Sequence, residues 1–126
     1  EQPVPAGRDA ELDGVARIMP LAADESCHTR ASLDAIVGRY SHINIKLDKA
    51  GGLTEALALA HAARARGLGL MTGCMLCSSL AIAPAFHLAM LGEYADLDGP
   101  LLIEDRAAGL RFEGSDVYPP DAALWG

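Results

Sequence analysis

Side chains that can do chemistry recur at regular intervals along this sequence, most of them directly after a short apolar run. One such position occurs roughly every 22–28 residues, in the order Glu1, Asp24, Lys46, Cys74 and the pair Asp96 and Asp98. An interval of that length holds one strand and one helix. The carboxyl ends of parallel strands lie on one face of a sheet, and α/β proteins carry their sites there. We therefore expect these side chains to form one site.

Glu1 and Asp24 are carboxylates one interval apart. Oxygen atoms are the ligands that Mg²⁺ prefers, so the pair suits a hard divalent cation. Two carboxylates leave such a site incomplete, and a further carboxylate or several waters have to complete it. The alternative interpretation is a solvated Glu1 and an Asp24 that caps the following helix.

Lys46 ends a β-branched run, so its ammonium is expected at the same mouth of the sheet. Beside a metal ion and partly removed from water, the pKa of a lysine falls and its amine can act as a general base. The alternative is an ordinary surface lysine in a strand-to-helix loop. The pattern predicts that Asp48 and Lys49 are exposed, with Lys49 at most pairing with a carboxylate.

Asp96 and Asp98 alternate along an extended segment, which predicts side chains that face opposite ways. A bend at Gly99 and Pro100 would bring both carboxylates toward one cation, such as the ammonium of a ligand. In the alternative, Asp98 satisfies backbone N–H groups within a turn.

Cys74 and Cys77 form a CxxC motif, which is typical of redox and zinc sites. A structural zinc site needs four ligands, and the sequence has neither a second CxxC nor a pair of histidines at ligand spacing. We expect Cys27, Cys74 and Cys77 to pack as small apolar residues.

The elements that must position these residues can be inferred from apolar periodicity and from Gly and Pro. Helices are expected over residues 8–19, 32–39, 53–66 and 78–91. Strands are expected over 21–23, 42–46, 69–72, a short run that ends at 96, and 101–103, before a loop-rich tail. Alternation of this kind predicts an α/β fold with a parallel sheet.

Composition excludes several classes of function. The chain has 126 residues, with 10 Lys and Arg against 17 Asp and Glu and a net charge of −7. This acidic balance argues against nucleic acid or an anionic membrane as partner. No apolar run reaches the ~18–20 residues of a membrane span, and the first residues lack the layout of a signal peptide. Three cysteines without framework spacing favour the cytoplasm, and the length ordinarily corresponds to one domain.

Five motifs carry a resemblance to a known family. They occur in the order EQP (1–3), ADES (23–26), NIKLDKAGG (44–52), GCM (73–75) and DLDGP (96–100). Together they resemble the barrel domain of the enolase superfamily, in its muconate-lactonizing subgroup, and DLDGP is similar to the motif of dipeptide epimerases. Members of that family often carry Glu where this chain has Cys77, so we expect the same reaction in a pocket of different shape.

The resemblance implies a role for each site residue. Glu1 and Asp24 would be the second and third ligands of a Mg²⁺ cofactor, at the ends of the fourth and fifth barrel strands. Lys46, on the sixth strand, would be one of two catalytic lysines. Asp96 and Asp98 would hold the α-ammonium of the substrate at the end of the eighth strand. The pocket would be lined from the seventh strand by Cys74, Met75 and Cys77.

The resemblance also implies that residues 1–126 are the C-terminal half of a (β/α)₈ barrel, from the end of strand four through strand eight and a tail. The capping domain, strands one to three, the first metal ligand and the second lysine have no counterpart here. The implied activity is Mg²⁺-assisted epimerisation of a dipeptide by a homo-oligomeric enzyme, with the missing N-terminal half as partner. Alternatives are a cycloisomerase, an N-acylamino-acid racemase, an o-succinylbenzoate synthase, or an inactive fragment.

Overall fold

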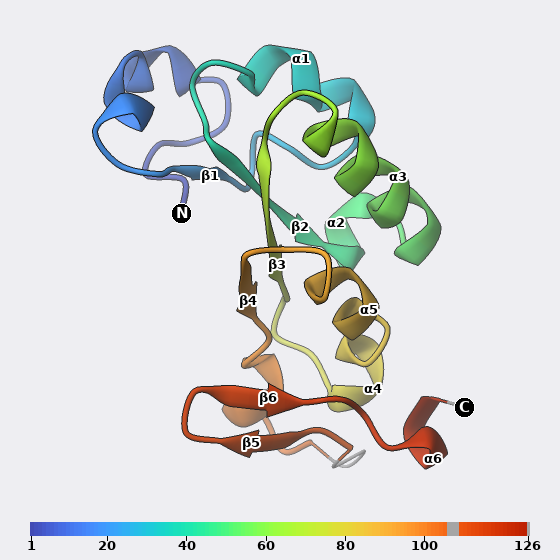
Figure 1. The fold of residues 1–126 in the computed structure, drawn as a ribbon. Coiled ribbons are helices and arrows are strands. Elements are labelled where there is room, and N and C mark those ends of the chain that lie inside the picture. The colour runs from blue at the N-terminus through green and yellow to red at the C-terminus, as the bar shows by residue number, and fades with distance from the viewer. Residues whose placement is uncertain (106–108, 126) are drawn as a thin grey trace.

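A four-stranded parallel sheet forms the centre of the molecule. In the computed structural model, which describes residues 1–105 and 109–125, the strand order is β1 (Ala22–Ala23), β2 (His42–Lys46), β3 (Gly69–Gly73) and β4 (Tyr94–Asp96). Each strand pairs in parallel with the next one along the chain. The sequence order is therefore also the spatial order, as Figure 1 shows.

Helices connect the strands and gather on one side of the sheet (Figure 1). They are α1 (Leu33–Ile36) between β1 and β2, α2 (Leu47–Ala50) and α3 (Leu53–Arg64) between β2 and β3, and α4 (Ser79–Ile82) and α5 (Ala85–Ala89) between β3 and β4. The α/β fold predicted from the sequence, with parallel strands alternating with helices, is confirmed.

The two faces of β2 separate core from site. Ile43 and Ile45 are at most 1% exposed and belong to the same apolar cluster as Leu59 of α3. Because side chains alternate along a strand, Asn44 and Lys46 project from the opposite face. The helices thus cover one face, and the chemically capable residues lie on the other.

Three predicted helices are much shorter than expected. Of residues 32–39, only α1 is an α-helix, and it follows a 3₁₀ helix at Arg30–Ser32. Residues 8–19 form two 3₁₀ helices, Asp9–Leu12 and Val15–Arg17, because Gly14 between them has a left-handed φ of 85°. Residues 78–91 are divided into α4 and α5, with Pro84 at the junction, where it cannot donate a helical hydrogen bond.

The segment after β4 also differs from the prediction. Leu101 and Leu102 lie in a 3₁₀ helix (Gly99–Leu102), not in a strand, with Pro100 near its start. An antiparallel hairpin of β5 (Arg111–Glu113) and β6 (Asp116–Tyr118) follows, and then α6 (Ala122–Trp125). The hairpin lies beyond the ends of β3 and β4 (Figure 1). No helix in the described ranges is long and apolar enough to cross a membrane.

Candidate active site

The sheet register brings three strand ends level. Lys46 at the end of β2 pairs with Gly73 of β3, and Gly73 pairs with Asp96 of β4. Asp24 directly follows β1. The structure therefore places three of the residues singled out in the sequence along one edge of the sheet, with Gly73 opening the segment that contains Cys74, Met75 and Cys77.

Asp24 is the centre of a charged cluster. Its side chain is only 5% exposed, and its Oδ2 lies 2.7 Å from Lys46 Nζ. Its other oxygen, Oδ1, lies 2.7 Å from Lys49 Nζ. Asp24 caps no helix, because the next one starts after Thr29. The alternative interpretation of Asp24 as a helix cap is therefore wrong.

Lys46 also reaches the second carboxylate. Its Nζ lies 3.3 Å from Glu1 Oε1, and its side chain is 14% exposed. Lys46 is thus not an ordinary surface lysine. Lys49, which the pattern placed at the surface, is only 18% exposed and pairs with a carboxylate, whereas Asp48 is exposed as expected.

The charges of this cluster oppose the effect of burial. Burial lowers the pKa of Lys46, but the hydrogen bond and charge of Asp24 and the charge of Glu1 outweigh it, so the pKa lies above its ordinary value. Burial likewise raises the pKa of Asp24, but its hydrogen bonds with Lys46 and Lys49 bring it below the ordinary value. The lowered lysine pKa expected from the sequence is therefore not produced by the chain's own groups.

Asn44 holds Glu1 on the same face. Its amide Nδ2 donates a hydrogen bond of 2.7 Å to Glu1 Oε1. Asn44 is 2% exposed, and its Oδ1 has no hydrogen-bond partner among the residues that the structure describes. Sequence reasoning missed this residue, although its position two residues before Lys46 on a strand predicts that both side chains share a face.

Gln2 was also missed. Its side-chain oxygen accepts hydrogen bonds from the backbone N–H groups of Asp24 (3.0 Å) and Ser26 (3.1 Å). Its Nε2 donates to Ser26 Oγ (3.0 Å) and to the carbonyl of Val4 (2.8 Å). Gln2 therefore joins the segment that carries Glu1 to the turn after Asp24. Its place beside Glu1 in the EQP motif was the signal available in the sequence.

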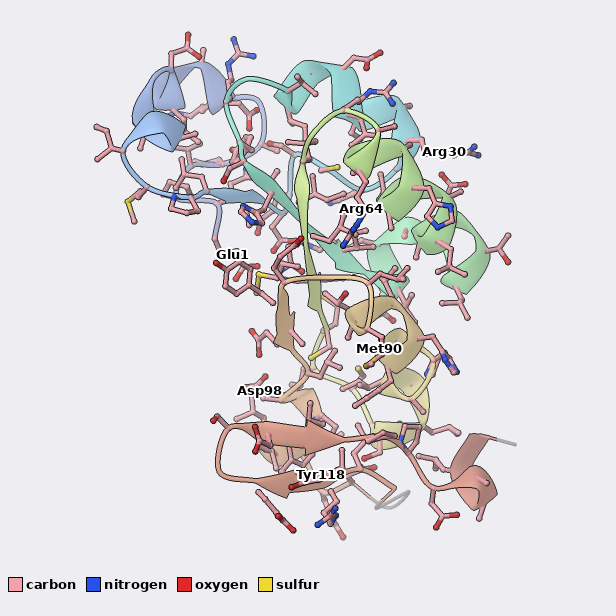
Figure 2. All side chains as sticks on the ribbon, viewed as in Figure 1. Glu1, Arg30, Arg64, Met90, Asp98 and Tyr118 are labelled. Carbon is pink, nitrogen blue, oxygen red and sulfur yellow. The ribbon has the colours of Figure 1, made fainter. Side chains whose placement is uncertain are left out.

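Asp96 and Asp98 meet at the end of β4. Loss of water, the charge of Asp98 and a hydrogen bond between the two carboxyl groups raise the pKa of Asp96. Both residues line the same hollow, so their side chains do not face opposite ways, and Asp98 makes no side-chain cap to the following 3₁₀ helix. Figure 2 shows Asp98 between β4 and the hairpin. Both carboxylates line a hollow of about 160 Å³ with Leu101, Phe112 and Val117.

The cysteines pack as the sequence predicted. Cys27 is buried in the core, and burial raises the pKa of its thiol to about 11. Cys74 and Cys77 are free thiols that pack against an apolar cluster containing Ile82 and Leu97. The sulfur of Cys74 accepts a hydrogen bond from the backbone of Gly99 at 3.4 Å, which joins the segment after β3 to the segment after β4.

The donor set fits part of a site for a hard cation. Glu1 and Asp24 already converge on one positive charge, the ammonium of Lys46. Within residues 1–105 and 109–125, however, no three His, Cys, Asp or Glu side chains form a group that could hold a metal ion. Any Mg²⁺ site built on this pair needs ligands from elsewhere.

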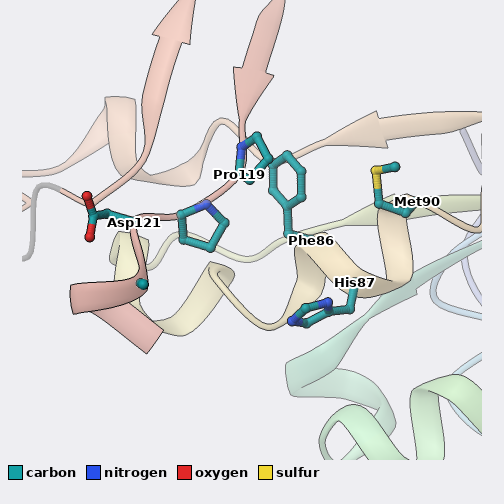
Figure 3. A pocket seen from close by; sticks show the side chains of 7 residues that line it. Phe86, His87, Met90, Pro119 and Asp121 are labelled. Atoms are coloured by element: carbon teal, nitrogen blue, oxygen red, sulfur yellow. The ribbon is translucent and has the colours of Figure 1, made fainter. Parts of the chain in front are cut away.

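The structure has two other hollows, one remote from the charged cluster and one that borders it only at Glu1. A groove of about 370 Å³ runs between α5 and the segment after β6, with Phe86, Met90 and Pro119 in its lining (Figure 3). A hollow of about 330 Å³ on the open face of the sheet is lined by Glu1, His42, Met71 and Tyr94, among others. The groove contains none of the predicted site residues, and the second hollow contains only Glu1.

Comparison with known proteins assigns the class. Residues 1–121 match the family model described as enolase C-terminal domain-like, and the chain belongs to this family. It is 54% identical to L-Ala-D/L-Glu epimerase of Escherichia coli (strain K12), over 94% of this chain and 37% of that protein. It is 50% identical to N-acetyl-D-glutamate racemase of a Pseudoalteromonas species, over 100% of this chain and 40% of that protein.

Solved structures show the same likeness. An enolase family member from Agrobacterium tumefaciens with homology to dipeptide epimerases, holding sodium and L-Ala-L-Glu, is 52% identical with a TM-score of 0.92, over 99% of this chain and 39% of that one. A dipeptide epimerase from Methylococcus capsulatus, complexed with Mg and L-Arg-D-Lys, is 36% identical with a TM-score of 0.84, over 95% of this chain and 37% of that one. The chain thus spans about two fifths of the length of these relatives.

Proposed function

We propose that this chain is the C-terminal part of a Mg²⁺-dependent epimerase barrel that acts on dipeptides. The observation that carries the proposal is the position of Lys46. Its Nζ lies 2.7 Å from Asp24 and 3.3 Å from Glu1, at the carboxyl edge of a parallel sheet. A base beside two potential metal ligands suits the removal of a proton next to a carboxylate.

In this proposal Lys46 Nζ takes the α-proton of the substrate, and a group from the rest of the barrel returns a proton to the opposite face. A bound divalent cation supplies positive charge that stabilises the negative charge developing on the substrate carboxylate. Glu1 and Asp24 are the ligands that this chain contributes. If these two carboxylates held a cation, they would no longer raise the pKa of Lys46, and the neutral amine would be easier to form.

Asp96 and Asp98 favour a substrate with a free ammonium group. Burial and the negative charge of Asp98 raise the pKa of Asp96. An ammonium placed between them relieves the repulsion between the two negative charges. A dipeptide carries such an ammonium on its first residue, whereas an N-acetyl amino acid has none.

N-acylamino-acid racemisation is the second candidate. It is favoured by the 50% identity to N-acetyl-D-glutamate racemase over the whole of this chain. Such a substrate would use Lys46, Glu1 and Asp24 in the same way and would leave the Asp96–Asp98 pair unused.

The test uses the complete chain that carries these residues, incubated with Mg²⁺ in deuterated water. L-Ala-L-Glu and N-acetyl-glutamate are supplied separately, and loss of the α-proton signal is followed by nuclear magnetic resonance. We expect exchange of the Glu α-proton in the dipeptide, and a loss of at least 1000-fold in Lys46→Met. Exchange in N-acetyl-glutamate alone would favour the second candidate, and exchange in neither substrate would exclude both.

The domain organisation has its own test. The strands β1 to β4 would be strands five to eight of the barrel, and the segment before them, with the capping domain, would supply the remaining ligand and lysine. We therefore expect residues 1–126 alone to show no exchange. Exchange by the purified piece at a rate near that of the complete chain would contradict this organisation.

A further inference from the structure

Both lysines of this chain contact the same carboxylate. The sequence has only Lys46 and Lys49, and its other eight basic residues are arginines. Lys46 Nζ lies 2.7 Å from Asp24 Oδ2, and Lys49 Nζ lies 2.7 Å from Asp24 Oδ1. One buried carboxylate therefore has a separate ammonium on each oxygen.

The two lysines are held by different elements. Lys46 is the last residue of β2, whereas Lys49 lies in α2, which is terminated by Gly51 with a left-handed φ of 87°. Ala50 beside Lys49 is 5% exposed and belongs to the apolar core. Packing of α2 against the core therefore fixes the base of the Lys49 side chain.

The proposed reaction makes conflicting demands on Lys46. As a base, its Nζ would have to turn to the substrate, and Asp24 would have to offer a free oxygen to the cation. Both movements break the contact between Lys46 and Asp24. The contact between Lys49 and Oδ1 is the one that can persist, because Lys49 has no part in the reaction.

We propose that Lys49 is a positioning residue that keeps Asp24 aimed at the cation while Lys46 serves the substrate. This inference rests on the proposed function, since it takes Asp24 as a metal ligand. Partners that orient a metal ligand from behind typically change metal affinity by about 10–100-fold when they are removed. Lys49 thus acts on the metal and not on the reacting atoms.

The chemistry of lysine suits this position better than that of arginine. An ammonium is a compact point charge that binds one carboxylate oxygen and leaves the other for a cation. A guanidinium is a planar fork that tends to take both oxygens of a carboxylate. Arginine at position 49 would therefore compete with the cation, although it keeps the positive charge.

The experiment measures Mg²⁺ binding directly, by calorimetric titration of the complete chain without substrate. Lys49→Met is compared with Lys49→Arg, and Arg30→Met is the control because Arg30 forms an exposed ion pair with Glu55 away from the site. We expect Lys49→Met to weaken Mg²⁺ binding by about 10–100-fold, Lys49→Arg to fall between it and the unchanged protein, and Arg30→Met to bind as the unchanged protein does. At saturating Mg²⁺, the kcat of Lys49→Met should approach that of the unchanged protein.

The outcomes separate the two proposals. If the unchanged protein binds no Mg²⁺, the proposed function fails. If it binds Mg²⁺ and Lys49→Met binds equally well, only the role of Lys49 is overturned. A kcat that stays low at saturating Mg²⁺ also overturns it. Circular dichroism checks that each variant is folded. If Lys49→Met does not fold, the Mg²⁺ affinity of Lys49→Arg is the test. An affinity equal to that of the unchanged protein would then contradict the inference.

Discussion

The side-chain oxygen of Gln2 lies 3.0 Å from the backbone nitrogen of Asp24 and accepts its hydrogen bond. Through this contact the segment that carries Glu1 is tied to the end of β1. The separation of the two carboxylates proposed as metal ligands therefore depends not only on Lys46 and Asn44, which contact them, but also on an uncharged amide that touches neither carboxylate group.

Replacing Gln2 by Ala tests that dependence. The change removes four hydrogen bonds, to Asp24, Ser26 and Val4. Since each contributes about 0.5–1.5 kcal/mol net, we expect Gln2→Ala to lower the free energy of unfolding by about 2–6 kcal/mol in urea titrations. Glu25→Gln, at an exposed position in the same turn, is the control. Equal stability of the two variants would contradict the role of Gln2.

Gly73 leaves room for Asn44. A Cβ at this position would lie 2.6 Å from Asn44 Oδ1 and 3.0 Å from Lys46 Cε. We expect Gly73→Ala to cost about 1–3 kcal/mol of stability, as overpacking does, and to slow α-proton exchange by displacing Lys46. Adding Asn44→Ala to Gly73→Ala should restore part of the stability but should not restore the rate of α-proton exchange. A double variant no more stable than Gly73→Ala would show that the clash lies elsewhere.

Ionised Asp96 lowers the stability of the folded chain at neutral pH. Its pKa is raised by loss of water and by Asp98. A carboxyl whose pKa is raised on folding stabilises the protein below its ordinary pKa, 3.8 here, and this contribution is lost as the pH rises through the folded value. Asp96→Asn should therefore be at least as stable as the unchanged protein at pH 7, while its KM for a dipeptide rises by about tenfold or more.

The control for Asp96→Asn is Asp34→Asn, at an exposed carboxylate that pairs with Arg66. We expect no change of KM in that variant. An unchanged KM in Asp96→Asn, measured over the same range of dipeptide concentration, would remove the pair from the substrate site.

The contact between Tyr40 and Asp9, away from the site, should make the stability of the protein depend on pH. The hydroxyl of Tyr40, which is 3% exposed, donates a hydrogen bond of 2.7 Å to Asp9 Oδ1. Burial raises the pKa of Asp9, but hydrogen bonds with Ser26 and Tyr40 outweigh it and lower the pKa. Stability from Asp9 is therefore present above its ordinary pKa of 3.8 and is lost as the pH falls through the lowered value.

Tyr40→Phe removes that hydrogen bond with little change of volume. We expect a loss of about 1 kcal/mol at pH 7, which shrinks as Asp9 becomes protonated. Urea unfolding at several pH values between 7 and 2 measures the difference. A loss that is constant over this range would mean that packing, and not the hydrogen bond, accounts for the effect.

Sequence patterns predicted the centre of the fold better than its periphery. β2, β3 and α3 lie where alternation and helical periodicity placed them, because each is buried on a face that its apolar residues define. The helix expected over 8–19 failed at Gly14, whose left-handed backbone breaks the periodicity. The strand expected at 101–103 failed because Gly99 and Pro100 begin a 3₁₀ turn that apolar content does not reveal.

For the site, strand spacing predicted which residues share an edge but not how they pair. Lys49 was expected at the surface because its pattern is that of a loop, whereas the packing of α2 directs it to Asp24. Gln2 and Asn44 carry no charge, so a search for acids and bases passes over them. Their roles depend on backbone N–H groups and on a neighbouring carboxylate that only the folded chain brings close.

The order of the strands has a consequence for local opening. β2 and β3 have neighbours on both sides and are linked through α3, whereas β1 and β4 are the outer strands of the sheet and are shorter. In residues 1–126 taken alone, the β2–α3–β3 unit should therefore hold the slowest-exchanging amides. Lys46 is the final residue of β2, so the proposed base stands on the most protected strand. Asp24 and Asp96 lie at the ends of β1 and β4, which open more readily in residues 1–126 alone and would be held closed where strands from the rest of the proposed barrel pair with them.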